Sequence, residues 1–200
     1  NTAYITANPF AEHDSDSARS ADLSKKNIGY FDPVFRRKWS KEPIGTTPPQ
    51  AVTEAAIDAW ETQSVDRMIV HYMQPHQPFR KQPEWESVHS NLENLATDVN
   101  QGGPDAWEQV RTGVLDHNEV WDAYKDNLWW VWADIHTNLI PEIDGHVLLS
   151  ADHGNALGEW GEWGHHGGML VPSVRKVPVI GPFTEGLAVS DTNDQYEYES

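Results

Sequence analysis

The sequence predicts an α/β fold with a mixed, mostly parallel sheet and helices on both faces. The segment 2–6 carries β-forming residues, and the segments 66–72 and 147–149 contain short apolar runs, patterns that are typical of strands. The segments between them carry apolar residues three and four positions apart, as amphipathic helices do. Strands that alternate with helices favour parallel pairing, because each helix serves as the crossover between neighbouring strands.

The first helix is expected to begin at Pro48-Pro49, since proline is tolerated in the first helical turn. Its apolar residues recur at the spacing of one helical face, which predicts that it packs on the sheet. The following strand, 66–72, is expected to be buried, with Met68-Ile69-Val70 as its apolar centre. The residues of the predicted helix face are Val52, Ala55, Ala56, Ala59 and Trp60.

The second half of the chain is expected to contain a helix over 85–99 and a longer helical region from 104 to about 139, with a bend at Gly113. Gly145 then precedes the strand 147–149, which is short, wholly apolar and therefore predicted to be buried on both faces. A glycine-rich loop leads to a last strand near 177–180. The apolar face of the long helical region is predicted to comprise Val120, Tyr124, Leu128, Val131, Ile135 and Leu139.

Composition indicates one acidic domain over 1–200, with an acidic, frayed tail at 191–200. Acidic residues outnumber basic ones by 31 to 14, which gives a net charge of −17. This charge argues against binding to nucleic acid and favours a source with high salt, where self-repulsion is screened. The chain has no cysteine and no apolar run of the roughly 18 residues needed for a membrane span. We therefore expect no membrane span and a cytoplasmic location.

The residues that follow the strand 147–149 form the main candidate site. Asp152 and His153 come at the carboxyl end of the strand, where open α/β sheets place their ligands. A carboxylate beside a neutral imidazole is a suitable ligand pair for a divalent metal, Zn or Mn more than Ca. The alternative is that Asp152 caps the next segment and His153 makes a local hydrogen bond.

Further histidines could complete this site. His76 lies in a loop stiffened by two prolines, and an imidazole that titrates near neutrality is suited to proton transfer. His165 and His166 lie in a loop with six glycines, which lets the backbone approach a bound group closely. His71 lies on a strand and is expected to pack or hydrogen-bond internally.

Three blocks of sequence resemble the sulfatase branch of the alkaline phosphatase superfamily. They are LLSADHGNALGEWGEWGHHGG followed by VRKVPVI, MIVHYMQPHQPF, and WDAYKDNLWWVWADI. The resemblance implies an alkaline phosphatase-like fold and a divalent metal ion (Zn, Mn or Ca) bound by Asp152 and His153. It also implies that His76 contacts the sulfate or phosphate group or protonates the leaving oxygen, and that His165, rather than His166, grips the transferred group.

The expected function is metal-dependent hydrolysis of sulfate or phosphate esters of small molecules or glycans. The blocks correspond to the C-terminal half to two-thirds of such an enzyme, so the nucleophile is expected outside this chain: there is no cysteine and no Pro-Ser-Arg segment. Gln74 and Trp160 stand where the family pattern has Asp and often His. These departures favour an alternative, a non-catalytic binding or assembly module. A phosphotransferase or phosphomutase of the same superfamily is a further alternative.

Overall fold

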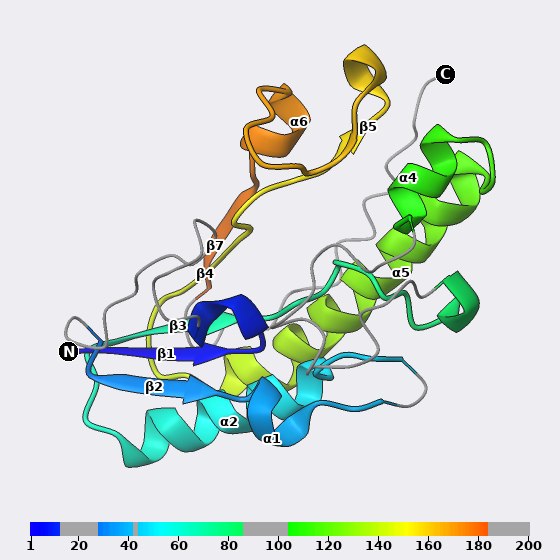
Figure 1. The fold of residues 1–200 in the computed structure, drawn as a ribbon. Helices are drawn as coiled ribbons and strands as arrows, with labels where there is room; N and C mark the ends of the chain where they lie inside the picture. Colours follow the sequence, from blue (N-terminus) through cyan, green and yellow to red (C-terminus); the bar gives the residue numbers. More distant parts are fainter. Residues whose placement is uncertain (13–27, 42–43, 86–103, 184–200) are drawn as a thin grey trace, which may run out of the picture.

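The computed structural model describes residues 1–12, 28–41, 44–85 and 104–183. It confirms a mixed α/β fold with a small parallel sheet (Figure 1). The predicted helix 85–99 and the tail 191–200 lie outside the described residues, apart from Trp85. The strands are β1 (Thr2–Thr6), β2 (Tyr30–Pro33), β3 (Arg67–His71), β4 (Val147–Ser150), β5 (Ala156–Leu157), β6 (Trp163–Gly164) and β7 (Val179–Phe183). The α-helices are α1 (Phe35–Lys38), α2 (Pro49–Thr62), α4 (Ala106–Arg111), α5 (His117–Asp134) and α6 (Pro172–Arg175).

The parallel sheet has the strand order β2-β1-β3, with β1 in the centre. Ile5 of β1 lies opposite Val70 of β3, and Thr6 lies opposite His71. Because side chains alternate along a strand, Ala3 and Ile5 share one face of the sheet, whereas Tyr4 lies on the opposite face together with His71. The register therefore fixes which residues of β1 and β3 can meet.

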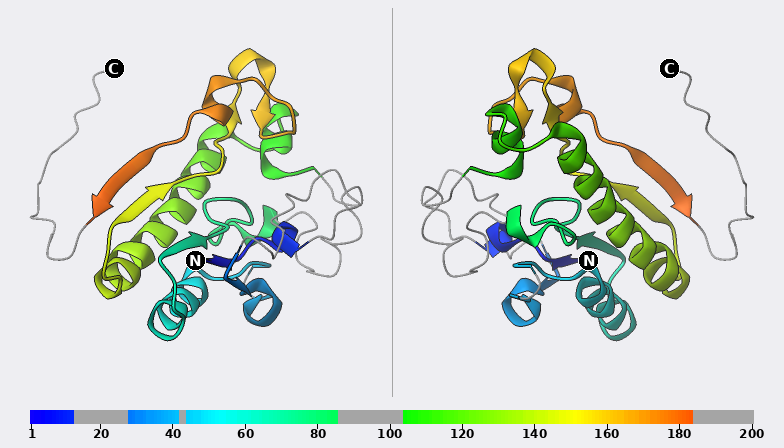
Figure 2. Two further views of the ribbon diagram at one scale, coloured as in Figure 1. Left: turned by 90° about the vertical axis from the view of Figure 1, so that its left-hand side faces the viewer. Right: turned by 90° about the vertical axis from the view of Figure 1, so that its right-hand side faces the viewer.

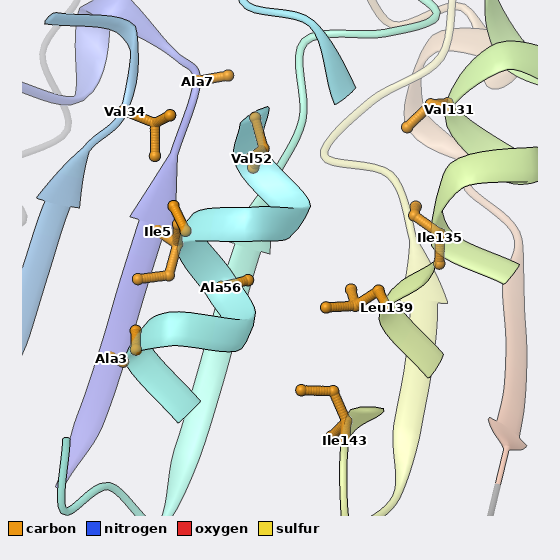
Figure 3. Packing of buried hydrophobic residues seen from close by; sticks show 12 residues of the cluster. Ala3, Ile5, Ala7, Val34, Val52, Ala56, Val131, Ile135, Leu139 and Ile143 are labelled. Atoms are coloured by element: carbon orange, nitrogen blue, oxygen red, sulfur yellow. The ribbon is translucent and has the colours of Figure 1, made fainter. Parts of the chain in front are cut away.

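The main core lies between the parallel sheet, α2 and α5. Ala3 and Ile5 of the sheet point toward Val52 and Ala56 of α2, and residues of α5 and the π-helical turn Ile135–Leu139 close the other side (Figure 3). In the described part of the chain both long helices lie on this one face, so the expected cover of both faces is not seen there. The predicted face of α2 is confirmed for the fully buried Val52, Ala56 and Ala59.

β4 departs from the prediction of a strand buried on both faces. It pairs with β7 in a two-stranded antiparallel sheet that lies beside α5 (Figure 2), and no hydrogen-bonded ladder between described residues joins it to the parallel sheet. Val147 and Leu149 pack against the main core, whereas Leu148 on the other face is 62% exposed. β3 is likewise less buried than predicted, since Ile69 is 55% exposed.

The long helical region is two helices rather than one bent helix. α4 ends at Arg111, Gly113 adopts a φ of +75°, and Asp116 caps α5 by accepting hydrogen bonds from the amides of Asn118 and Glu119. A positive φ is a conformation that glycine adopts without steric cost, which explains the break. The predicted buried face is confirmed for Val120 and Val131 of α5 and for Ile135 and Leu139 of the π-helical turn that follows it. It is wrong for Leu128, which is 46% exposed. Asn127 is buried in its place.

Candidate functional site

Three segments that are distant in sequence meet at one place. His71 and His76 come from the end of β3 and the loop after it, Asp152 and His153 follow β4, and His165 follows β6. The ring centroids of His153 and His165 are 4.2 Å apart, and those of His76 and His165 are 5.2 Å apart. Four of the five residues predicted from the sequence thus lie together. The fifth, His166, is exposed on the loop beside His165.

Asp152 lies between two imidazoles. Its Oδ2 is 3.8 Å from His71 Nε2, and its Oδ1 is 3.8 Å from His153 Nε2. Oδ1 also accepts a hydrogen bond of 3.0 Å from the backbone N–H of His153, so the local role considered for Asp152 is present as well. One carboxylate therefore faces a nitrogen of each ring without a direct hydrogen bond to either ring, since 3.8 Å exceeds that range.

His153 and His76 share one tautomer, which the hydrogen bonds of their Nδ1 atoms indicate. His153 Nδ1 lies 3.0 Å from the carbonyl oxygen of Gly154, and His76 Nδ1 lies 2.5 Å from that of Gln77. A carbonyl oxygen can only accept a hydrogen bond, so Nδ1 carries the proton in each ring. In the neutral imidazole the lone pair is then on Nε2, the arrangement typical of histidines that bind a metal.

His165 is the most deeply perturbed member of the group. Its pKa is lowered to about 3, mainly by burial and then by the nearby His76 and His153, while Asp152 opposes the shift. His165 Nδ1 lies 2.6 Å from Oδ1 of Asn155, and the Asn155 side chain also lies close to the hydroxyl group of Tyr124. At neutral pH this ring is therefore uncharged.

His71 takes part in the group although the sequence predicted only an internal role. The internal hydrogen bond exists, because Tyr4 Oη and His71 Nδ1 are 2.7 Å apart. The other nitrogen, however, faces Asp152. Burial lowers the pKa of His71, Asp152 partly offsets this, and His153 lowers it further. The pairing of His71 with Tyr4 depends on the β1–β3 register, which cannot be read from the sequence, so no sequence signal indicated the role of His71.

The loop that carries His76 is held by α5. Asn127 donates hydrogen bonds from Nδ2 to the carbonyl oxygens of His76 (3.2 Å) and Pro78 (2.9 Å), and its Oδ1 accepts one from the backbone N–H of Arg80 (3.1 Å). Asn127 is completely buried. The available signal was a polar residue on the predicted apolar face of a helix, since position 127 lies three residues after Tyr124 and four before Val131.

The two residues that depart from the family pattern lie in different settings. Gln74 is buried, and its Nε2 donates to Thr46 Oγ1 (3.3 Å) and to the carbonyl oxygen of Thr47 (3.2 Å). Gln74 thus joins two loops. Trp160 is 76% exposed on the turn between β5 and β6, with a φ of +56°.

The donors fit a divalent metal in chemical type. Two ligands held about 2.1 Å from Zn²⁺ at tetrahedral angles lie roughly 3.4 Å apart, close to the distances around Asp152. Within the residues that the structure describes, however, no set of three or more His, Cys, Asp or Glu side chains is arranged to hold a metal ion. Asp152 and His153 are therefore two donors of suitable chemical type without a third in place among the described residues.

Comparisons with protein-family models, with curated protein sequences and with solved structures gave no significant match. Among the described helices, none combines the length and the apolar character required to cross a membrane.

Proposed function

We propose that this chain carries part of the active site of a metal-dependent hydrolase of sulfate or phosphate esters, with the nucleophile outside these 200 residues. The observation that carries the proposal is the meeting of Asp152 with imidazoles from three separate segments, with His165 packed against both His153 and His76. The resemblance to the sulfatase branch of the alkaline phosphatase superfamily, and an alkaline phosphatase-like fold, belong to the same proposal.

In this proposal Asp152 and His153 hold part of the shell of a divalent metal ion. The Nδ1–H of His153 is donated to Gly154, so its Nε2 lone pair is available on the side of Asp152. When bound, such an ion would polarise a nonbridging oxygen of the ester and help to neutralise its charge. Both ligands follow β4 directly, so a single turn of backbone sets their spacing.

His76 is proposed to act as the general acid that protonates the leaving group. Its Nδ1–H is committed to the carbonyl oxygen of Gln77, so proton exchange with the substrate must use Nε2. When the ring is protonated, Nε2–H can donate to the ester oxygen as the bond from that oxygen to sulfur or phosphorus breaks. The product alcohol then holds the proton, and His76 returns to its neutral form.

The metal assignment is tested by metal analysis. The protein is dialysed against Zn²⁺ or Mn²⁺ and then against buffer, and its metal content is measured by plasma mass spectrometry. We expect Asp152→Ala and His153→Ala to fall below the stoichiometry of the wild type. His146→Ala, which removes an exposed imidazole just before β4, is the matched control. Unchanged metal content in both site variants would contradict the assignment.

The reaction is tested by paired assays with an aryl sulfate and an aryl phosphate in concentrated salt, on the longest chain that the coding sequence provides. Hydrolysis of either ester that is lost in His76→Ala supports the enzyme.

A non-catalytic binding module is the second candidate. Gln74 favours it, because this buried residue joins two loops where the family pattern has a carboxylate. Binding of an ester without turnover on the longest chain would support this candidate over the enzyme.

A further inference from the structure

Two consecutive residues of α5 bind the loop that carries His76. Asn127 binds three backbone groups of the loop, and its neighbour Asp126 binds the side chains of Arg80 and Lys81. Asp126 Oδ2 lies 2.6 Å from Arg80 Nε, and its Oδ1 lies 3.2 Å from Arg80 Nη2. Two parallel hydrogen bonds between a guanidinium and a carboxylate fix the relative orientation of both groups.

Arg80 has a further contact with α5. Its guanidinium carbon lies 5.4 Å from the centroid of the Trp130 ring, one helical turn beyond Asp126. The Asp126 side chain is only 14% exposed, and the pKa of its carboxyl is lowered, mainly by the hydrogen bond from Arg80. Lys81 also contacts Asp126, but its side chain is 66% exposed. Because exposed ion pairs contribute little, Arg80 is the main partner of Asp126.

These contacts hold one end of the loop, and a second set of contacts holds the other end. Gln74, two residues before His76, is hydrogen-bonded to Thr46 and Thr47. Arg80 follows His76 by four residues, and two prolines between Gln74 and Arg80 further restrict the backbone. His76 therefore lies in the middle of a segment that is fixed on both sides.

We infer that Arg80 is a positioning residue, which fixes the loop through Asp126 and Trp130 so that the ring of His76 stays against His165. The rings of His76 and His165 meet edge-on with 5.2 Å between their centroids. The inference rests on the proposed function, because it specifies how His76 is held where it can protonate the leaving group. In this role Arg80 acts through the backbone of the loop and does not touch the substrate.

The first test compares Arg80→Gln with Lys81→Gln, which removes the same charge from the neighbouring position. The buried Phe79 remains in both variants, and circular dichroism checks that both are folded. We expect the wild type to show a nuclear Overhauser effect between ring protons of His76 and His165, each ring being assigned by its loss in the corresponding glutamine variant. Arg80→Gln should lose this effect and Lys81→Gln should keep it.

Asp126→Asn supplies a second route to the same test, because it removes the partner charge of Arg80 without changing the shape of the side chain. It should also lose the Overhauser effect, and it replaces Arg80→Gln if that variant does not fold. An Overhauser effect that persists in Arg80→Gln and Asp126→Asn, or that is lost equally in Lys81→Gln, would overturn the inference.

Kinetics on the longest chain that the coding sequence provides supply a second readout. Arg80→Gln should lower kcat about tenfold or more and change KM by less than about twofold, because a displaced His76 loop impairs proton transfer rather than substrate contact. Lys81→Gln should leave both constants unchanged. A raised KM at unchanged kcat in Arg80→Gln would show that Arg80 binds the anionic ester directly and would overturn the positioning role. If the wild type hydrolyses neither ester, the proposed function fails, while the Overhauser effect still decides whether Arg80 positions His76.

Discussion

Replacement of His165 by glutamine should change how the stability of the protein depends on pH. The folded-state pKa of His165 is lowered to about 3, whereas an unfolded histidine titrates near 6.5. Between these values the unfolded chain binds a proton that the folded chain does not. Protonation therefore favours unfolding in this window, and the penalty is absent above about pH 7.5.

The size of the effect follows from the two pKa values. Below pH 6.5 the penalty grows by about 1.4 kcal/mol for each pH unit, which gives about 2 kcal/mol at pH 5. This figure is insensitive to the folded-state value, because any folded pKa below about 4 leaves the ring almost wholly neutral at pH 5. It reflects mainly burial of the ring, with the neighbouring imidazoles as a smaller contribution.

The assay is urea unfolding of the wild type and of His165→Gln at pH 8 and pH 5, at one fixed high salt concentration. On acidification the wild type should lose about 2 kcal/mol more free energy of unfolding than the variant. His146→Gln, at an exposed position, controls for the loss of one imidazole. Equal losses in the wild type and His165→Gln would refute the claim that this ring is neutral in the folded protein.

Three further substitutions test the supports of the fold. Asn127→Ala removes the hydrogen bonds that Asn127 makes to two carbonyl groups and one amide of the His76 loop, so urea unfolding should show a loss of about 3 kcal/mol. Asp116→Ala removes the N-cap of α5 and should lower the free energy of unfolding by about 1 kcal/mol in the same urea titration. An unchanged free energy of unfolding would show that water replaces the cap without loss. Val52→Ala should cost about 2 kcal/mol in thermal or urea unfolding, because Val52 is wholly buried. Val179→Ala, at a position that is 71% exposed, should change stability by less than about 0.5 kcal/mol, and equal effects of the two valine substitutions would contradict the placement of the core.

The elements that the sequence predicted correctly are those that a local pattern determines. β1, α2 and β3 lie within one or two residues of their expected bounds, because strand formers, a proline start and an apolar face each act over a few residues. β2 was not predicted as a strand, since Asp32 and Pro33 are rare in strands. The tertiary interaction that makes it a strand is its pairing with β1, and its buried Asp32 is paired through two hydrogen bonds with Arg37, five residues further along the chain.

The errors concern what each element packs against. Val147-Leu148-Leu149 is wholly apolar, and the sequence alone could not show that its only strand partner within the described residues is β7. This two-stranded antiparallel sheet leaves one face to solvent, so Leu148 and Val179 are exposed despite their hydrophobicity. In the same way, the participation of His71 in the site depends on the β1–β3 register, which brings its ring to Tyr4.

α5 connects the fold to the site through two residues on one face. Tyr124 and Asn127 are three positions apart, and side chains at this spacing project from the same side of a helix. Tyr124 lies close to Asn155, whose Oδ1 contacts His165 Nδ1, and Asn127 holds the loop that carries His76. The two imidazoles therefore take their separation of 5.2 Å between ring centroids from a single rigid element, although they are 89 residues apart in the chain. The face that the apolar pattern predicted to serve only the core thus also carries the polar residues that assemble the site.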